Sequence, residues 1–97
     1  MVRLFISQPM RGRSDDEITA ERDYVKAAAE RILKEEVKVI DSFFQGGDMK
    51  PLEYLGESLK LLANADWAWF CDGWERARGC RVENICAREY GVPIIRC

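Results

Sequence analysis

Glu83 is the side chain best placed for chemistry in this sequence. It follows an apolar run at 67–71 and a glycine-bracketed turn at 73–79. This order predicts a strand, a turn and a helix that carries the carboxylate about one turn from its start, where a doubly wound sheet directs an acid at a ligand. The helix dipole favours the ionised form there, so Glu83 is a candidate nucleophile or general base. A glutamate near a helix start also stabilises the helix, and that interpretation stays open.

A second polar group follows the apolar segment 2–6. Ser7, Gln8 and Arg11 offer hydroxyl, amide and guanidinium groups, and Gly12 lets the backbone approach a ligand closely. These groups suit a phosphate or sugar hydroxyls. A helix-entry loop with a solvated arginine is the alternative. The loop matches neither a dinucleotide-binding glycine motif nor a Walker loop, so we expect no cofactor.

Two further acids lie at predicted strand ends, Asp41 and Asp72. With Glu83 they would form a carboxylate cluster of the kind that glycoside chemistry uses. Aspartates at strand ends are also common turn and cap formers, and this reading remains open for each.

Aromatic residues in the same loops are candidates for stacking on a planar base. They are Phe43, Phe44 and Trp74, of which Trp74 is the preferred one. Simple packing is the alternative. Ser42 and Gly79 belong to the same two loops and complete the predicted substrate-binding residues.

The elements that must position these residues alternate along the chain. Strands are predicted at 2–6, 37–41, 66–71 and 94–95, and helices at 14–36, from 51, and at 79–90. The order β-α-β-α-β-α-β with short connections requires parallel pairing through right-handed crossovers. We therefore predict a flavodoxin-like, three-layer α/β sandwich with a four-stranded parallel sheet. Three loops, at 7–12, 41–48 and 72–79, converge at the carboxyl ends of its strands.

The helices carry their own signals. Ser14 and Glu17 form a capping box for the first helix. The second helix begins near Pro51 and carries a stripe of leucines that we expect in the core: Leu52, Leu55, Leu59 and Leu62.

Size and charge limit the function classes. The chain has 97 residues, 47% of them hydrophobic, so we expect one domain over 1–97 and a small core that a second copy could cover as a homodimer or higher oligomer. The net charge of −2 is not that of a duplex-binding protein. Neither a membrane-length apolar run nor a signal-peptide pattern is present, and we expect a cytoplasmic protein.

The cysteines do not predict a metal site. Cys71, Cys80, Cys86 and Cys97 include no C-x-x-C pair, and the chain has no histidine. Three of them lie in predicted strands or helices, where a free thiol behaves as a small core residue.

Several of these segments together resemble the nucleoside 2-deoxyribosyltransferase-like superfamily, and more closely its small phage- and bacteria-associated members of unknown function. The segments are 6–12, 39–44, 65–66 and 73–83, and the similarity spans essentially the whole chain. The resemblance implies a small-molecule nucleoside or nucleotide as ligand. In the characterised relatives, deoxyribosyltransferases and deoxynucleoside 5′-monophosphate N-glycosidases, a glutamate on the third helix attacks the anomeric carbon. Glu83 matches that glutamate by position. Arg11 and Gly12 match the stretch that binds the 5′-phosphate.

The chain also departs from those enzymes at three polar positions. Phe5 stands where a tyrosine is usual, Ser58 where the second helix has an aspartate, and Ala77 where a serine helps to hold phosphate. Two hypotheses follow. The first is an enzyme that cleaves or transfers at an N-glycosidic bond, with Glu83 as nucleophile and Asp41 or Asp72 as the acid. The second is a nucleotide-binding or interaction module without catalysis.

Overall fold

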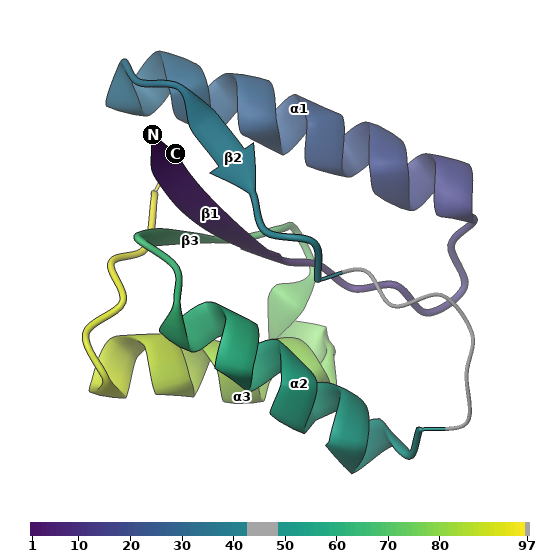
Figure 1. Ribbon diagram of the computed structural model, residues 1–97. Helices are drawn as coiled ribbons and strands as arrows, with labels where there is room; N and C mark the ends of the chain where they lie inside the picture. The colour runs from purple at the N-terminus through teal and green to yellow at the C-terminus, as the bar shows by residue number, and fades with distance from the viewer. Residues whose placement is uncertain (43–48, 97) are drawn as a thin grey trace.

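A parallel sheet lies between two helical layers in the computed structural model, which describes residues 1–42 and 49–96 (Figure 1). Helix α1 covers one face of the sheet, and α2 and α3 lie together on the other. The strands are β1 (Val2–Ser7), β2 (Val37–Val39) and β3 (Trp67–Phe70), and the helices are α1 (Asp15–Leu33), α2 (Pro51–Ala63) and α3 (Arg78–Glu89). The predicted three-layer α/β architecture is thus confirmed.

Strand β1 is the centre of the sheet, whose strand order is β2-β1-β3. Its Leu4 is paired with Val39 on one side and with Trp67 on the other, both in parallel register. Leu4 and Ile6 are buried in the cluster beneath α1, whereas Phe5 packs in the cluster on the α2 and α3 side. Because both faces of β1 are covered, Leu4, Phe5 and Ile6 are apolar whichever face they point to. This continuous hydrophobic run makes the strand easy to predict from the sequence.

The predicted fourth strand is wrong, because the sheet among the described residues has three strands. The C-terminal segment forms only an isolated parallel bridge between Ile94 and Ala68. The Ala68 amide donates to the Pro93 carbonyl at 2.9 Å, and the Ile95 amide donates to the Ala68 carbonyl at 2.9 Å. Pro93 has no N–H to donate, and Gly91 turns the chain at φ 77° just before it, so the pairing covers too few residues for a strand.

The first helix begins as the capping box predicts. The Ser14 hydroxyl accepts from the Glu17 amide at 3.1 Å, and the Glu17 carboxylate accepts from the Ser14 amide at 3.2 Å. The helix ends at Leu33, three residues before the predicted end, because Lys34 adopts a left-handed conformation with φ 56°. A residue of that conformation terminates helices commonly.

The leucine stripe of α2 is only partly in the core, which corrects the sequence prediction. Leu62 is buried against the sheet, Leu55 and Leu59 are half-buried, and Leu52 is 76% exposed. Helix α2 packs on α3 and meets the buried cluster at its C-terminal end, whereas Leu52 in its first turn stays exposed. Neither α2 nor any other described helix is long and apolar enough to cross a membrane.

Candidate functional site

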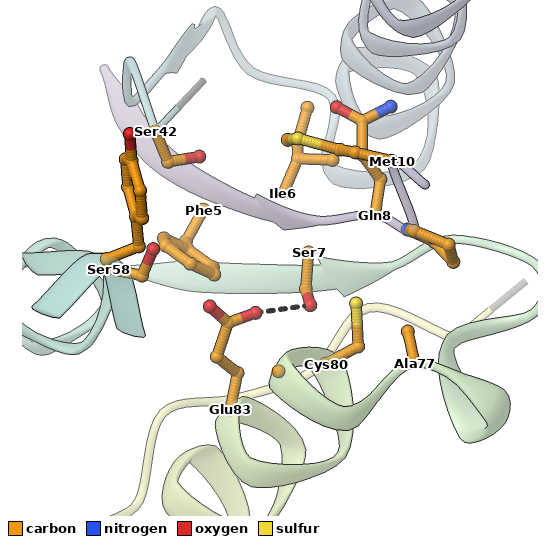
Figure 2. Close-up of a pocket in the computed structure, with 13 residues that line it drawn as sticks. Phe5, Ile6, Ser7, Gln8, Met10, Ser42, Ser58, Ala77, Cys80 and Glu83 are labelled. Carbon is orange, nitrogen blue, oxygen red and sulfur yellow. Dashed lines mark hydrogen bonds between the residues drawn. The ribbon is translucent and has the colours of Figure 1, made fainter. Parts of the chain in front are cut away.

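Glu83 points from α3 toward the end of β1, where it meets Ser7 (Figure 2). The Ser7 hydroxyl donates to the Glu83 carboxylate with an oxygen-to-oxygen distance of 2.6 Å. Glu83 is 8% exposed and Ser7 is 2% exposed. The local sequence achieves this because Gly73, at φ 87°, turns the chain out of β3 into a short 3-10 turn, η1 (Trp74–Arg76), before α3 begins. The carboxylate therefore faces the carboxyl end of the central strand.

Burial controls the charge of this carboxylate. Loss of solvent raises the pKa of Glu83 above the ordinary 4.5, while hydrogen bonding from Ser7 and Ser58 opposes that rise only in part. From its place in the sequence, Glu83 is predicted to be kept ionised by the helix dipole. The net rise shows that burial outweighs the stabilisation of the charged form, so Glu83 keeps its proton to a higher pH than an exposed glutamate does.

A cavity of about 360 Å³ opens over the Ser7–Glu83 pair. Its wall is mostly apolar with a few polar groups, which is the usual composition of a small-molecule site. It is lined by Phe5, Ile6, Ser7, Gln8, Pro9, Met10, Ser42, Tyr54, Ser58, Ala77, Gly79, Cys80 and Glu83 (Figure 2). Five of the residues singled out from the sequence as site residues are thus brought together here: Ser7, Gln8, Ser42, Gly79 and Glu83.

Gln8 lines the cavity, but its amide group is bonded to α1. Its Nε2 donates to the Glu21 carboxylate at 2.8 Å and to the Ile18 carbonyl at 3.3 Å, and its Oε1 accepts from Arg22 at 3.0 Å. Three bonds on the α1 side leave little capacity for a ligand. In this arrangement Gln8 fixes the path of the first loop.

Other predicted site residues lie elsewhere. Asp41 is exposed and, like Trp74, does not line the cavity. The Trp74 ring packs instead on Phe70, with centroids 5.7 Å apart. Arg11 and Asp72 line a neighbouring hollow. Asp41, Asp72 and Glu83 are therefore not gathered in one cavity.

Gly12 adopts a left-handed φ of 78° in the turn before α1, a conformation that favours glycine. Phe43 lies outside the described residues, as does the neighbouring Phe44.

Helix α2 contributes Tyr54 and Ser58 to the cavity. Tyr54 was not singled out from the sequence, whereas Ser58 was named only as standing where the resembled enzymes have an aspartate. They are four residues apart and thus share one helix face, beside the leucine stripe. In the sequence, two hydroxyl-bearing residues at this spacing beside an apolar stripe could have indicated a polar face of the helix next to the core. Helix α2 thus adds two hydroxyl-bearing side chains to the cavity wall.

The comparison with known families identifies a domain but no activity. Residues 2–96 match the model of a family described as a domain of unknown function, DUF4406. The chain belongs to this family. No curated protein and no solved structure matches it. Because the DUF4406 match extends from β1 through α3, it includes the cavity and the Ser7–Glu83 pair. The resemblance to the deoxyribosyltransferase-like superfamily stays a prediction.

In this DUF4406 domain a half-buried arginine joins the first loop to the segment after β2. Besides its bond to Gln8, Arg22 donates through Nη2 to the Ile40 carbonyl at 2.9 Å and to the Ser42 hydroxyl at 3.3 Å. Burial lowers the pKa of Arg22, and the charge of Asp41 opposes that fall. The arginine therefore positions Ser42 at the cavity from the α1 side.

Three thiols of the DUF4406 domain lie within the described residues, and these are free. Cys71, Cys80 and Cys86 form no disulfide within the described residues. Burial raises the pKa of Cys71 to about 12, so this thiol is protonated and unreactive near neutral pH. No group of three or more acidic or cysteine side chains that could hold a metal occurs in residues 1–42 and 49–96.

Proposed function

We propose that this protein cleaves or transfers at the N-glycosidic bond of a nucleoside or nucleotide, with Glu83 as nucleophile. The observation that carries the proposal is a buried carboxylate, held by Ser7 at 2.6 Å, on the wall of a cavity at the carboxyl end of β1. Ligands of doubly wound sheets bind at these strand ends. The cavity volume of about 360 Å³ falls within the range of small-molecule sites.

The proposed reaction has two steps. The Glu83 carboxylate attacks the anomeric carbon, a carbon–oxygen bond forms, and the carbon–nitrogen bond breaks with its electron pair leaving on the base. The base then takes a proton. Water or a second base next attacks the anomeric carbon and releases Glu83, which gives hydrolysis or transfer respectively. Attack requires ionised Glu83, so its raised pKa sets the acid limit of the reaction.

The proton for the leaving base has several possible sources. Asp41 and Asp72, the acids proposed from the sequence, do not line the cavity, so each would serve only a base that extends beyond it. Tyr54 and Ser58 line the cavity, so their hydroxyl groups and solvent are alternative sources.

Free base release tests the proposal. Wild type and Glu83→Gln are incubated with a panel of nucleosides and deoxynucleoside monophosphates, and free base is followed by chromatography. Loss of the nucleophile should lower the rate by about a thousandfold or more. Glu89→Gln, an exposed change at the end of the same helix, is the matched control and should keep full activity. Equal base release by wild type and Glu83→Gln would overturn the assignment.

A non-catalytic nucleotide-binding module is the second candidate. Phe5, Ser58 and Ala77 favour it, because the enzymes that the chain resembles carry hydrogen-bonding tyrosine, aspartate and serine at these positions. A binding module predicts that a nucleotide stabilises the folded protein and is not cleaved by it. A nucleotide at a hundred times its dissociation constant should add about 2.7 kcal/mol to the free energy of unfolding, while no base is released.

A further inference from the structure

Beside the Glu83 cavity lies a larger hollow of about 700 Å³ with an unusual concentration of arginines. Its charged residues are Arg11, Arg13, Arg76, Arg78, Arg81, Glu21 and Asp72. These groups give an excess of three positive charges, in a chain whose net charge is −2. The two spaces share Pro9, Met10, Ala77 and Gly79 in their walls, so they adjoin.

Most of this positive charge is not neutralised inside the protein. Arg13 is paired with Glu21 at 2.7 Å, and Arg81 donates only to the uncharged Glu75 carbonyl at 3.1 Å. Arg11, Arg76 and Arg78 are exposed and take part in no ion pair among the described residues. Guanidinium groups gathered in this way favour an anion that accepts several hydrogen bonds at once, as phosphate oxygens do.

The start of α3 adds backbone donors to the same hollow. The helix begins at Arg78 with no side-chain cap and no acidic residue in its first turn. The first amides of a helix have no partner within the helix, and the dipole there favours negative charge. Gly79, the second residue of α3, lines the hollow and leaves open space where a side chain would stand.

Helix geometry relates the two spaces. Glu83 follows Arg78 by five residues, which places them about 7.5 Å apart along the helix axis. The two spaces adjoin at Ala77 and Gly79, so a sugar at Glu83 would direct its 5′ substituent toward the start of the helix. The base and sugar would then occupy the smaller cavity, and the 5′ substituent would enter the hollow.

We propose that the arginine-lined hollow binds the phosphate chain of a nucleotide that carries two or more phosphates. This deepens the proposed function and rests on it for the placement of the sugar at Glu83. One phosphate ester carries at most about two negative charges, which is too few for the excess charge of the hollow. A second phosphate supplies the missing charge. The hollow is also larger than the adjoining cavity, with about 700 Å³ against 360 Å³.

Binding of inorganic anions tests the hollow without any turnover. Titration calorimetry of the wild-type protein with phosphate, pyrophosphate and tripolyphosphate should give about tenfold tighter binding for pyrophosphate than for phosphate. Arg78→Ala and Arg76→Ala should each weaken the binding of pyrophosphate by about tenfold. Arg31→Ala, an exposed change on α1, should leave this binding unchanged. Equal affinity for phosphate and pyrophosphate, or arginine variants that bind like wild type, would overturn the proposal.

Nucleotides in the same assay separate the two proposals. Glu83→Gln should bind nucleoside diphosphates about tenfold more tightly than monophosphates, and this preference should disappear in Glu83→Gln combined with Arg78→Ala. Diphosphate binding without base release by the wild type would defeat the glycosidic activity and leave the hollow in place. Base release with equal efficiency from nucleosides, monophosphates and diphosphates would defeat the phosphate-chain proposal and leave the activity in place.

Discussion

Burial and hydrogen bonding act in opposite directions on Glu83. Desolvation raises the pKa of its carboxyl, and the hydroxyls of Ser7 and Ser58 limit that rise. The donor at 2.6 Å from Ser7 is available to either protonation state, because a neutral carboxyl group also accepts a hydrogen bond. The site therefore disfavours the ionised form of Glu83, and the Ser7 hydrogen bond is retained when the carboxyl group is neutral.

The raised pKa predicts how stability depends on pH. The unfolded chain releases the Glu83 proton near the ordinary pKa of 4.5, whereas the folded chain retains it to a higher pH. Increasing pH between the two pKa values therefore lowers the free energy of unfolding. Above the pKa of the folded state this decrease is complete. Glu83→Gln lacks this titration, so the variant should gain stability relative to wild type as pH rises through that window.

Urea denaturation at a series of pH values measures this difference. Ser7→Ala removes the donor that lowers the pKa, so the window should extend to higher pH in that variant. Glu89→Gln, which is exposed, serves as control and should follow wild type. A constant difference between wild type and Glu83→Gln from acid to neutral pH would contradict the prediction.

The sequence identified the two central residues of the site for physical reasons. Ser7 and Glu83 both follow predicted strands, and in a parallel sheet such positions meet at one edge. Asp41 and Trp74 satisfy the same rule but do not line the cavity. Parallel strands place their following loops at one edge of the sheet. The direction of each side chain within a loop depends on tertiary packing, which sequence periodicity does not encode.

At the scale of elements, Arg22 holds the first loop and the end of β2 on α1. Its guanidinium bonds to the Gln8 side chain, the Ile40 carbonyl and the Ser42 hydroxyl. Arg22→Ala leaves these acceptors without their donor and should lower the free energy of unfolding by about 2 to 3 kcal/mol. Arg22→Lys should recover little of the loss, because an ammonium group cannot reproduce the planar geometry of the donors.

Guanidinium chloride denaturation checks this prediction, with Arg31→Ala as the exposed control on the same helix. The control should change the free energy of unfolding by no more than about 0.5 kcal/mol. An Arg22→Ala protein as stable as the control would show that the three contacts contribute little.

Local sequence signals predicted where helices and strands occur better than they predicted how these elements pack together. The capping box of α1 is specified by residues three positions apart, so the sequence alone suffices. The residues Ile94 and Ile95 have strand propensity, yet their pairing with Ala68 stops at a bridge. The exposure of Leu52 likewise depends on how far α2 extends past its neighbours, which its own periodicity cannot show.

At the scale of the whole molecule, α2 and α3 retain apolar surface in the described chain. Leu52 is 76% exposed, Ile85 51% and Tyr90 85%. Because a small domain covers little of its own apolar surface, we predict a symmetric dimer that packs through these helices. Leu52→Asp should shift the protein toward monomer at micromolar concentration.

Light scattering measures the oligomeric state. The control is Ile32→Asp, which places the same charge on the opposite layer, at a residue that is 46% exposed on α1. This variant should stay dimeric. A monomeric wild type, or equal behaviour of the two aspartate variants, would contradict the predicted interface.

The bond between Ser7 and Glu83 joins residues 76 positions apart. Closing so long a loop costs conformational entropy before any contact compensates for it. Contacts of this separation slow the folding of a domain. Any partly folded chain in which α3 has not docked on β1 therefore lacks the Ser7–Glu83 contact, and with it the candidate site.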